Sequence, residues 1–178
     1  MGQQPQPSEF EARTNAVYEA LMWALSRPGL VRNLPDRGVA QVVETLIDME
    51  CAVHCDTEEM RGPIGRCGAS IVDPEQADHL FFARQPEPEI LRQLRMGTDL
   101  HPEDGATLIG TARLGEGSRL RLTGPGCDGP VAIAVKGLSP AFWAERARIS
   151  RYPLGFEMFL IDGDRVVGVP RSVQVEVL

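Results

Sequence analysis

Two pairs of arginine and serine beside prolines are the residues of this sequence best suited to holding an anion. Ser26 and Arg27 precede a proline, and Arg171 and Ser172 follow one. A guanidinium group on a rigid backbone can bind a carboxylate or a phosphoryl group through two parallel hydrogen bonds. The same arginines could equally form structural ion pairs, so the sequence leaves both interpretations open.

A glycine-rich segment, residues 124–129, has the spelling Gly-x-Gly-x-x-Gly of a dinucleotide-binding fingerprint. It follows a predicted strand, but Pro130 leads into another strand instead of the helix whose N-terminus would hold a pyrophosphate. Pro125 also removes one amide donor. We therefore interpret the segment as a tight turn, in which Gly124 and Gly126 are candidates for contact with a ligand or a partner.

Cys51, His54 and Cys55 form a local group of soft metal ligands, which Cys67 could complete as a zinc site if the loop folded back. The group lacks a paired Cys-x-x-Cys. Free cysteines packed as small hydrophobic residues are the usual outcome of such a pattern. We therefore expect free thiols and no metal site.

Covalent or acid-base catalysis has few candidates in this chain. Cys127 could act as a nucleophile beside one of the three histidines, although the sequence alone does not bring them together. Glu103 and Asp104 look like paired carboxylates, but neighbours in a loop usually face water. The sequence contains no Gly-x-Ser-x-Gly, no phosphate-binding loop and no His-x-x-x-His. We therefore assign no catalytic residue.

The basic residues are one lysine, Lys136, and seventeen arginines. Any chemistry that needs a lysine amine, such as a Schiff base with pyridoxal phosphate, must use Lys136. It lies in a predicted strand, and a side chain pointing into the core would leave no such amine, so we expect no cofactor. The net charge of −7 opposes attraction to nucleic acid or to an anionic membrane surface.

A length of 178 residues suits one domain, 1–178, and the 43% share of hydrophobic residues is typical of a globular protein. No stretch approaches the roughly 20 apolar residues that span a bilayer. The segment Met1–Pro7 has no hydrophobic region of the kind found in signal peptides. We expect a cytoplasmic protein.

The elements that must position these residues alternate between helices and strands. Ser8 and Glu11 match a capping box that begins a helix running to about Arg27, and Ser139-Pro140 begins another that runs to about Ile149. Two more helices are expected over 39–49 and 87–95. Strands are expected over 80–83, 106–114, 118–123, 131–136, 156–161, 165–169 and 173–177.

Two regions are harder to interpret. Gly115-Glu116-Gly117 predicts a hairpin turn between the strands on either side of it. Residues 51–78 give weak signals, and 64–72 could hold a strand or an irregular loop. The alternation as a whole predicts an α/β fold, with a mixed β-sheet and helices on its faces.

Several short segments stand out when the chain is read in order. They are Leu21-Met22-Trp23-Ala24-Leu25-Ser26-Arg27-Pro28-Gly29, Gly97-Thr98 with His101-Pro102-Glu103 and Ala106-Thr107-Leu108, Leu122-Thr123-Gly124-Pro125-Gly126, Tyr152-Pro153-Leu154-Gly155, and Pro170-Arg171-Ser172. Together they resemble the PhnH family of phosphonate metabolism. Residues 51–77 carry least of the resemblance. Cys127 stands where the family pattern has an aliphatic residue, and Glu157 where it has aspartate.

The resemblance implies a single PhnH-like domain with a three-layer αβα fold, similar to pyridoxal-phosphate-dependent transferases without the cofactor. It also implies a subunit of the carbon-phosphorus lyase core complex, with PhnG, PhnI and PhnJ as partners and a homodimer in isolation. In that complex a phosphonate displaces adenine from ATP, which gives α-D-ribose 1-methylphosphonate 5-triphosphate when the phosphonate is methylphosphonate. The family has no firmly assigned catalytic residue in this subunit.

Three functions therefore remain open from the sequence. The first is an assembly subunit, as the resemblance implies. The second is a free-standing small-molecule enzyme or binding protein that uses Ser26, Arg27 and Arg171 as an anion pocket. The third is a structural dimer without a ligand.

Overall fold

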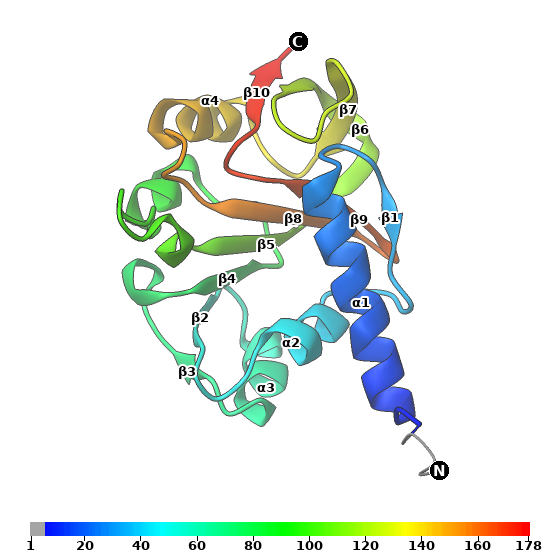
Figure 1. Ribbon diagram of the computed structural model, residues 1–178. Coiled ribbons are helices and arrows are strands. Elements are labelled where there is room, and N and C mark those ends of the chain that lie inside the picture. The colour runs from blue at the N-terminus through cyan, green and yellow to red at the C-terminus, as the bar shows by residue number, and fades with distance from the viewer. Residues whose placement is uncertain (1–5) are drawn as a thin grey trace.

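The computed structural model describes residues 6–178, so most of the polar segment Met1–Pro7 lies outside the described residues. A seven-stranded mixed sheet forms its centre (Figure 1). In spatial order its strands are β1 (Arg32–Asn33), β9 (Arg165–Val169), β8 (Glu157–Asp162), β5 (Thr107–Thr111), β4 (His79–Phe82), β2 (Ala52–Cys55) and β3 (Ser70–Ile71). The strands from β8 to β3 run parallel, whereas β9 and β1 are antiparallel to their neighbours.

Side chains of the central strands alternate between two separate hydrophobic cores. In β4, Leu80 and Phe82 belong to one core and Phe81 to the other, and all three are buried. Successive residues of a strand point to opposite faces, so a strand buried on both faces has a continuous apolar sequence. The Leu-Phe-Phe run is therefore the sequence pattern of an inner strand.

Three helices cover one face of this sheet, with Val17, Leu21 and Ala24 of the first helix in the core beneath them. They are α1 (Glu9–Ser26), α2 (Ala40–Leu46) and α3 (Glu58–Arg66). The predicted capping box at the start of α1 is confirmed: the Glu11 amide donates to Ser8 Oγ, and the Ser8 amide donates to the Glu11 carboxylate. Two orphan amide groups are satisfied in this way.

The opposite face is covered by a mixture of elements rather than by helices alone. A three-stranded antiparallel sheet lies there in the order β10, β6, β7, together with helix α4, and Figure 1 shows α4 beside β10. The bounds are β6 (Arg113–Thr123), β7 (Val131–Lys136), β10 (Gln174–Val177) and α4 (Pro140–Ile149), with short 3-10 helices η1 (Pro74–Gln76), η2 (Pro88–Gln93) and η3 (Pro102–Asp104).

The predicted α/β fold with a mixed sheet is confirmed, and most expected elements are present. The prediction of a hairpin turn at Gly115-Glu116-Gly117 is wrong. Strand β6 continues through these residues as a bulge, where Leu114 and Ser118 both lie opposite Val135. Strands β5 and β6 belong to different sheets. The two glycines take φ values of +93° and +83°, which a bulge can use as readily as a turn.

Residues 51–78 hold more regular structure than their sequence indicates. They form β2, α3 and β3, and a proline at position 63 lies inside α3. The helix expected over 87–95 is the 3-10 helix η2. Among residues 6–178, no helix combines the length and the apolar character that crossing a bilayer would require.

Glu145 joins α4 to η2. Its carboxylate accepts a hydrogen bond from Arg148 Nη2 at 2.6 Å and another from Arg92 Nε at 2.7 Å. These bonds, Arg148 first and then Arg92, lower the pKa of Glu145 from 4.5 to about 2. Hydrogen bonds to the charged form of a carboxylate favour that form.

We predict that Glu145→Gln lowers the free energy of unfolding at neutral pH. The stabilisation by a carboxylate with a lowered pKa is fully present above its unfolded value near 4.5 and is lost as the pH falls toward about 2. The difference between the variant and the parent should therefore shrink across that interval in urea unfolding curves. Glu59→Gln, at an exposed α3 position without an ion pair to the described residues, is the control. A pH-independent difference for Glu145→Gln would contradict the prediction.

Candidate functional site

Three segments that are distant in the sequence meet at one end of the small sheet. A Cβ atom added to Gly126 would lie 2.5 Å from the carbonyl oxygen of Ser26, and one added to Gly124 would lie 2.8 Å from that of Ser172. Both glycines have positive φ, +136° at Gly124 and +84° at Gly126. The turn after β6 thus packs its bare backbone against the end of α1 on one side and the segment after β9 on the other.

The side chains of Ser26 and Arg27 line neither of the two cavities beside Arg171 that are described below. Ser26 Oγ donates to the Met22 carbonyl oxygen at 2.7 Å, a bond within α1. Arg27 is exposed, and its side chain forms no hydrogen bond or ion pair with the described residues. Arg27 lines neither of the two cavities that Arg171 lines, so the structure gives the two side chains no shared pocket for an anion.

Arg171 is held by a nearly buried ion pair with Glu157, whose side chain is 20% exposed against 15% for Arg171. Arg171 Nε donates to Glu157 Oε1 at 2.5 Å, and the Arg171 amide donates to Oε2 at 2.8 Å. Nη1 donates to the carbonyl oxygen of Pro102. This geometry matches the structural ion pair that the sequence left open as one interpretation of Arg171.

Arg146, on α4, is the charged residue that sequence reasoning missed. Its side chain is 1% exposed, and its guanidinium lies 5.8 Å from the ring centre of Phe156. Nη1 donates to the Val173 carbonyl at 3.1 Å and Nη2 to the Pro170 carbonyl at 2.9 Å. Burial lowers the pKa of Arg146 to about 10, with Glu157 opposing the shift, so the group keeps its charge at neutral pH.

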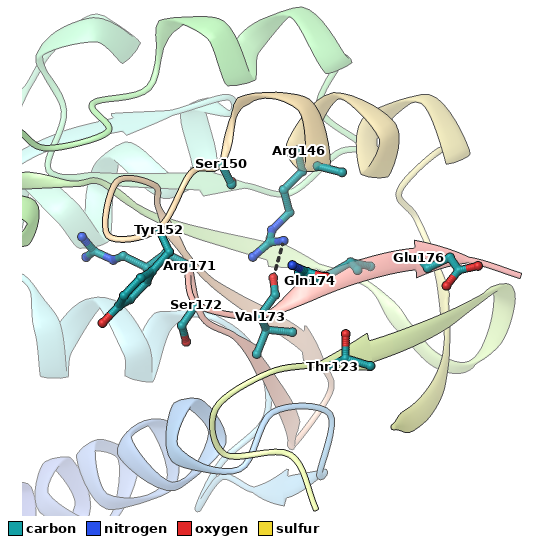
Figure 2. A pocket seen from close by; sticks show the side chains of 11 residues that line it. Thr123, Arg146, Ser150, Tyr152, Arg171, Ser172, Val173, Gln174 and Glu176 are labelled. Carbon is teal, nitrogen blue, oxygen red and sulfur yellow. Dashed lines mark hydrogen bonds between the residues drawn. The ribbon is translucent and has the colours of Figure 1, made fainter. Parts of the chain in front are cut away.

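A cavity of about 400 Å³ lies between α4, the segment after β9 and β10. Figure 2 shows the guanidinium of Arg146 extending from α4 toward Val173, with Ser150, Tyr152 and Arg171 nearby. The lining residues are Thr123, Arg146, Ala147, Ser150, Tyr152, Arg171, Ser172, Val173, Gln174, Val175 and Glu176. A second hollow of about 420 Å³ shares Tyr152, Arg171 and Ser172 with it and is otherwise lined by Pro102, Glu103, Pro125, Pro153 and Glu157.

Comparison with known proteins identifies the family. The model of the family described as "Bacterial phosphonate metabolism protein (PhnH)" matches residues 8–176. The chain belongs to the PhnH family. A relative from Stutzerimonas stutzeri, named "Putative C-P lyase subunit protein HtxG", is 31% identical over 169 residues, which cover 92% of this chain and 86% of the relative. The match takes in every residue that lines the two cavities, so the junction belongs to the PhnH-like part of the chain.

The other residues considered from sequence lie apart in this PhnH-family chain. No group of three possible metal ligands occurs in residues 6–178. Val53 and Cys55 point to one face of β2, which turns the intervening His54 to the other. Burial raises the pKa of the Cys127 thiol, and within residues 6–178 no hydrogen bond joins it to a histidine.

Lys136 is exposed, contrary to the possibility that it points into the core. Its side chain is 67% accessible, and Nζ lies 3.7 Å from Glu116 Oε2 across the β6–β7 pair. Glu103 and Asp104 are exposed, as expected of neighbours in a loop. His101 Nδ1 lies 3.1 Å from Glu103 Oε1. These groups lie on the surface of the PhnH-family chain.

We predict strong coupling between Arg171 and Glu157 in a double-mutant cycle. Removing one partner of a buried ion pair leaves an uncompensated charge, so Arg171→Met and Glu157→Gln should each cost about 3 kcal/mol of unfolding free energy. The double variant should cost less than the sum by at least about 1 kcal/mol. The exposed pair Arg121–Glu176 is the control, with an expected coupling below about 1 kcal/mol. Additive effects at Arg171 and Glu157 would contradict the prediction.

We predict that Gly126→Ala destabilises the PhnH-family chain much more than Gly129→Ala. Both glycines have left-handed φ values, which cost a residue with a Cβ about 1–2 kcal/mol. Only Gly126 also faces backbone within 3 Å, and such overpacking adds about 1–3 kcal/mol. Denaturant unfolding of the two variants isolates the contact between the turn and the end of α1. Equal losses would show that the added Cβ at position 126 causes no overpacking and would contradict the prediction.

Proposed function

We propose that this chain is a subunit of a carbon-phosphorus lyase assembly. The family match across residues 8–176 carries the proposal, because the family is one of bacterial phosphonate metabolism. The Stutzerimonas stutzeri relative, whose printed name describes a C-P lyase subunit, supports the same role. Since the two chains align over most of their lengths, the proposal concerns the whole domain rather than a fragment of it.

Within this assembly, we propose that the chain supports formation of α-D-ribose 1-methylphosphonate 5-triphosphate from ATP and a phosphonate, together with PhnG, PhnI and PhnJ. A supporting rather than a catalytic contribution agrees with the geometry of Arg171. Its guanidinium donates from Nε to Glu157 and from Nη1 to a main-chain carbonyl, so two of its five N–H groups hold the fold.

Three finer features belong to the same proposal. We propose a cytoplasmic location, where a phosphonate and ATP would both be present, and a homodimer in isolation. We further propose that the layered arrangement is related to that of pyridoxal-phosphate-dependent transferases and that the chain works without the cofactor. Helices on one face of a mixed sheet and α4 on the other are compatible with that relationship.

We propose that the outer face of α1 contacts another subunit of the assembly. Tyr18 is 52% exposed and Trp23 is 47% exposed, and they line a shallow apolar hollow with Met22. Aromatic residues and methionine are enriched in protein interfaces. The guanidinium of Arg32 lies over the Trp23 ring, 5.1 Å from its centre, in a cation–π contact.

We predict that the tagged chain co-purifies with PhnG, PhnI and PhnJ counterparts from its host. Trp23→Glu should reduce recovery of these partners at least about tenfold, because it places a charge in an apolar contact. Phe10→Glu, also an exposed α1 aromatic beneath an arginine, is the matched control and should leave recovery unchanged. Quantitative mass spectrometry of the eluates measures both effects.

Absence of all three partners from the parent eluate would refute the assembly role. Recovery by the parent with no loss in Trp23→Glu would instead show that the subunits contact a different surface. Circular dichroism of both variants confirms that any loss of partners does not come from unfolding.

A further inference from the structure

Strand β7 is the longest edge strand of the described chain. It forms one side of the small sheet, whose order is β10, β6, β7, whereas α4 packs beside β10 at the other side (Figure 1). The outer strands of the large sheet, β1 and β3, have two residues each. Among residues 6–178, no main-chain hydrogen bond reaches β7 from a segment other than β6. Every second residue of β7 therefore presents an amide and a carbonyl group that pair with nothing in the chain.

The sequence of β7 is apolar over five consecutive residues, 131–135. Proteins usually place a lysine or a proline on such an edge, because an open apolar edge pairs with other chains. In β7 these residue types stand only at the two ends of the apolar run, as Pro130 and Lys136. They limit the length of the open edge and leave its middle free to pair.

The apolar run reads the same in both directions, Val131-Ala132-Ile133-Ala134-Val135. In an antiparallel pair of two copies centred on Ile133, valine lies opposite valine, alanine opposite alanine and isoleucine opposite isoleucine. All β-branched side chains of both copies then share one face, and all alanines share the other. A two-fold axis requires a surface that matches itself in this way.

The two faces of β7 suit this pairing. Val131, Ile133 and Val135 pack on the core beneath the small sheet, so the pairing continues one apolar face across the axis. Ala132 is exposed on the other face, and Ala134 is partly exposed there. These two methyl groups leave space for a second copy to approach the edge.

Charge does not oppose the contact. In this register, residue 136 of one copy lies opposite residue 130 of the other, so the two Lys136 side chains lie at opposite ends of the ladder. Each of them faces the end of the turn that contains Asp128, whose side chain is exposed. Copies of a chain with a net charge of −7 repel one another in general. An uncharged strand with a basic residue at its end is therefore a favourable place for two copies to meet.

A second apolar feature borders the same edge. A Cβ atom added to Gly29 would lie 2.8 Å from Val131 Cγ1 and 3.2 Å from Ile133 Cγ2, so this segment runs against β7. The next two residues, Leu30 and Val31, are each 48% exposed. Neighbouring exposed aliphatic side chains are typical of interaction surfaces. The apolar area offered to a second copy thus extends beyond the strand itself.

We propose that β7 pairs with β7 of a second copy in an antiparallel register centred on Ile133, which joins the two small sheets into one. The inference rests on the homodimer proposed above and gives it a surface. This surface is separate from the outer face of α1, which we assign to other subunits. An extended segment of a different subunit could add to the same edge through its main chain. The self-matching run favours the second copy.

Sedimentation equilibrium of the purified full-length chain, from roughly 1 to 100 μM, tests the proposal with two double variants. Ala132→Glu with Ala134→Glu places like charges opposite each other across the axis, so the association constant should fall at least about a hundredfold. Ala132→Glu with Ala134→Lys places a glutamate opposite a lysine in the same register, so association should stay within about threefold of the parent.

The chain offers internal controls for this comparison. Within one copy, residues 132 and 134 lie opposite Arg121 and Arg119 of β6, so two glutamates are compatible with the folded monomer. Gln174→Glu, at an exposed position of β10 on the other edge, should associate as the parent does.

Amide hydrogen exchange locates the contact without any substitution. Peptides that cover residues 131–135 should exchange more slowly at roughly 100 μM than at roughly 1 μM, because pairing protects the open amides. Peptides from α1 should exchange at the same rate at both concentrations.

A parent chain that stays monomeric across this range would overturn both the edge contact and the homodimer. A dimer that survives the two glutamates, or protection confined to another segment, would overturn the edge contact and leave a homodimer on a different surface. Equal loss in both double variants would refute the register centred on Ile133. Protection of β7 that appears only after other subunits are added would assign the edge to one of them. The assembly role is judged separately, by co-purification.

Discussion

The segment that connects the two sheets depends on main-chain carbonyls bound by a buried cation. Residues 170–173 lead from β9 in the central sheet to β10 in the small sheet, and Arg146 donates to the carbonyls at both ends of this segment. Arg171, inside the segment, is tied to the start of β8 through Glu157. A desolvated guanidinium costs free energy, and charge-assisted hydrogen bonds offset that cost while fixing the geometry.

The turn that contains Gly124 and Gly126 packs against the same connecting segment, residues 170–173. Gly124 approaches the backbone at Ser172 and Gly126 approaches the backbone at Ser26, so the turn lies between two segments that are held independently. A side chain at either glycine would push one of these segments away. The three sequence motifs that stood out for possible ligand binding are therefore joined by backbone contact. Their side chains, by contrast, do not converge on one ligand.

Elements with strong local signals could be predicted from the sequence, and those that depend on tertiary context could not. The capping residues of α1 and α4 mark both helix starts correctly, since a cap is read from a few adjacent residues. In the region 51–78 the sequence allowed a strand within 64–72, where β3 lies, but it did not predict β2 or α3, because these strands are two to four residues long and α3 contains Pro63. The bulge in β6 was mistaken for a hairpin turn, because glycines with positive φ suit both structures equally well.

The sequence identified Arg171 as an arginine held by rigid backbone, but it did not identify the residues that lie around it in the candidate site. Arg171 was identified by its rigid setting, yet its partner Glu157 is fourteen residues away, and no local pattern links them. Arg146 follows Phe142 and Trp143, which are both buried, so an arginine on the apolar face of a helix was the available signal. Such an arginine is usually expected to extend its charge into water. In this chain the carbonyls of residues 170 and 173 replace water, and only the fold brings them within reach.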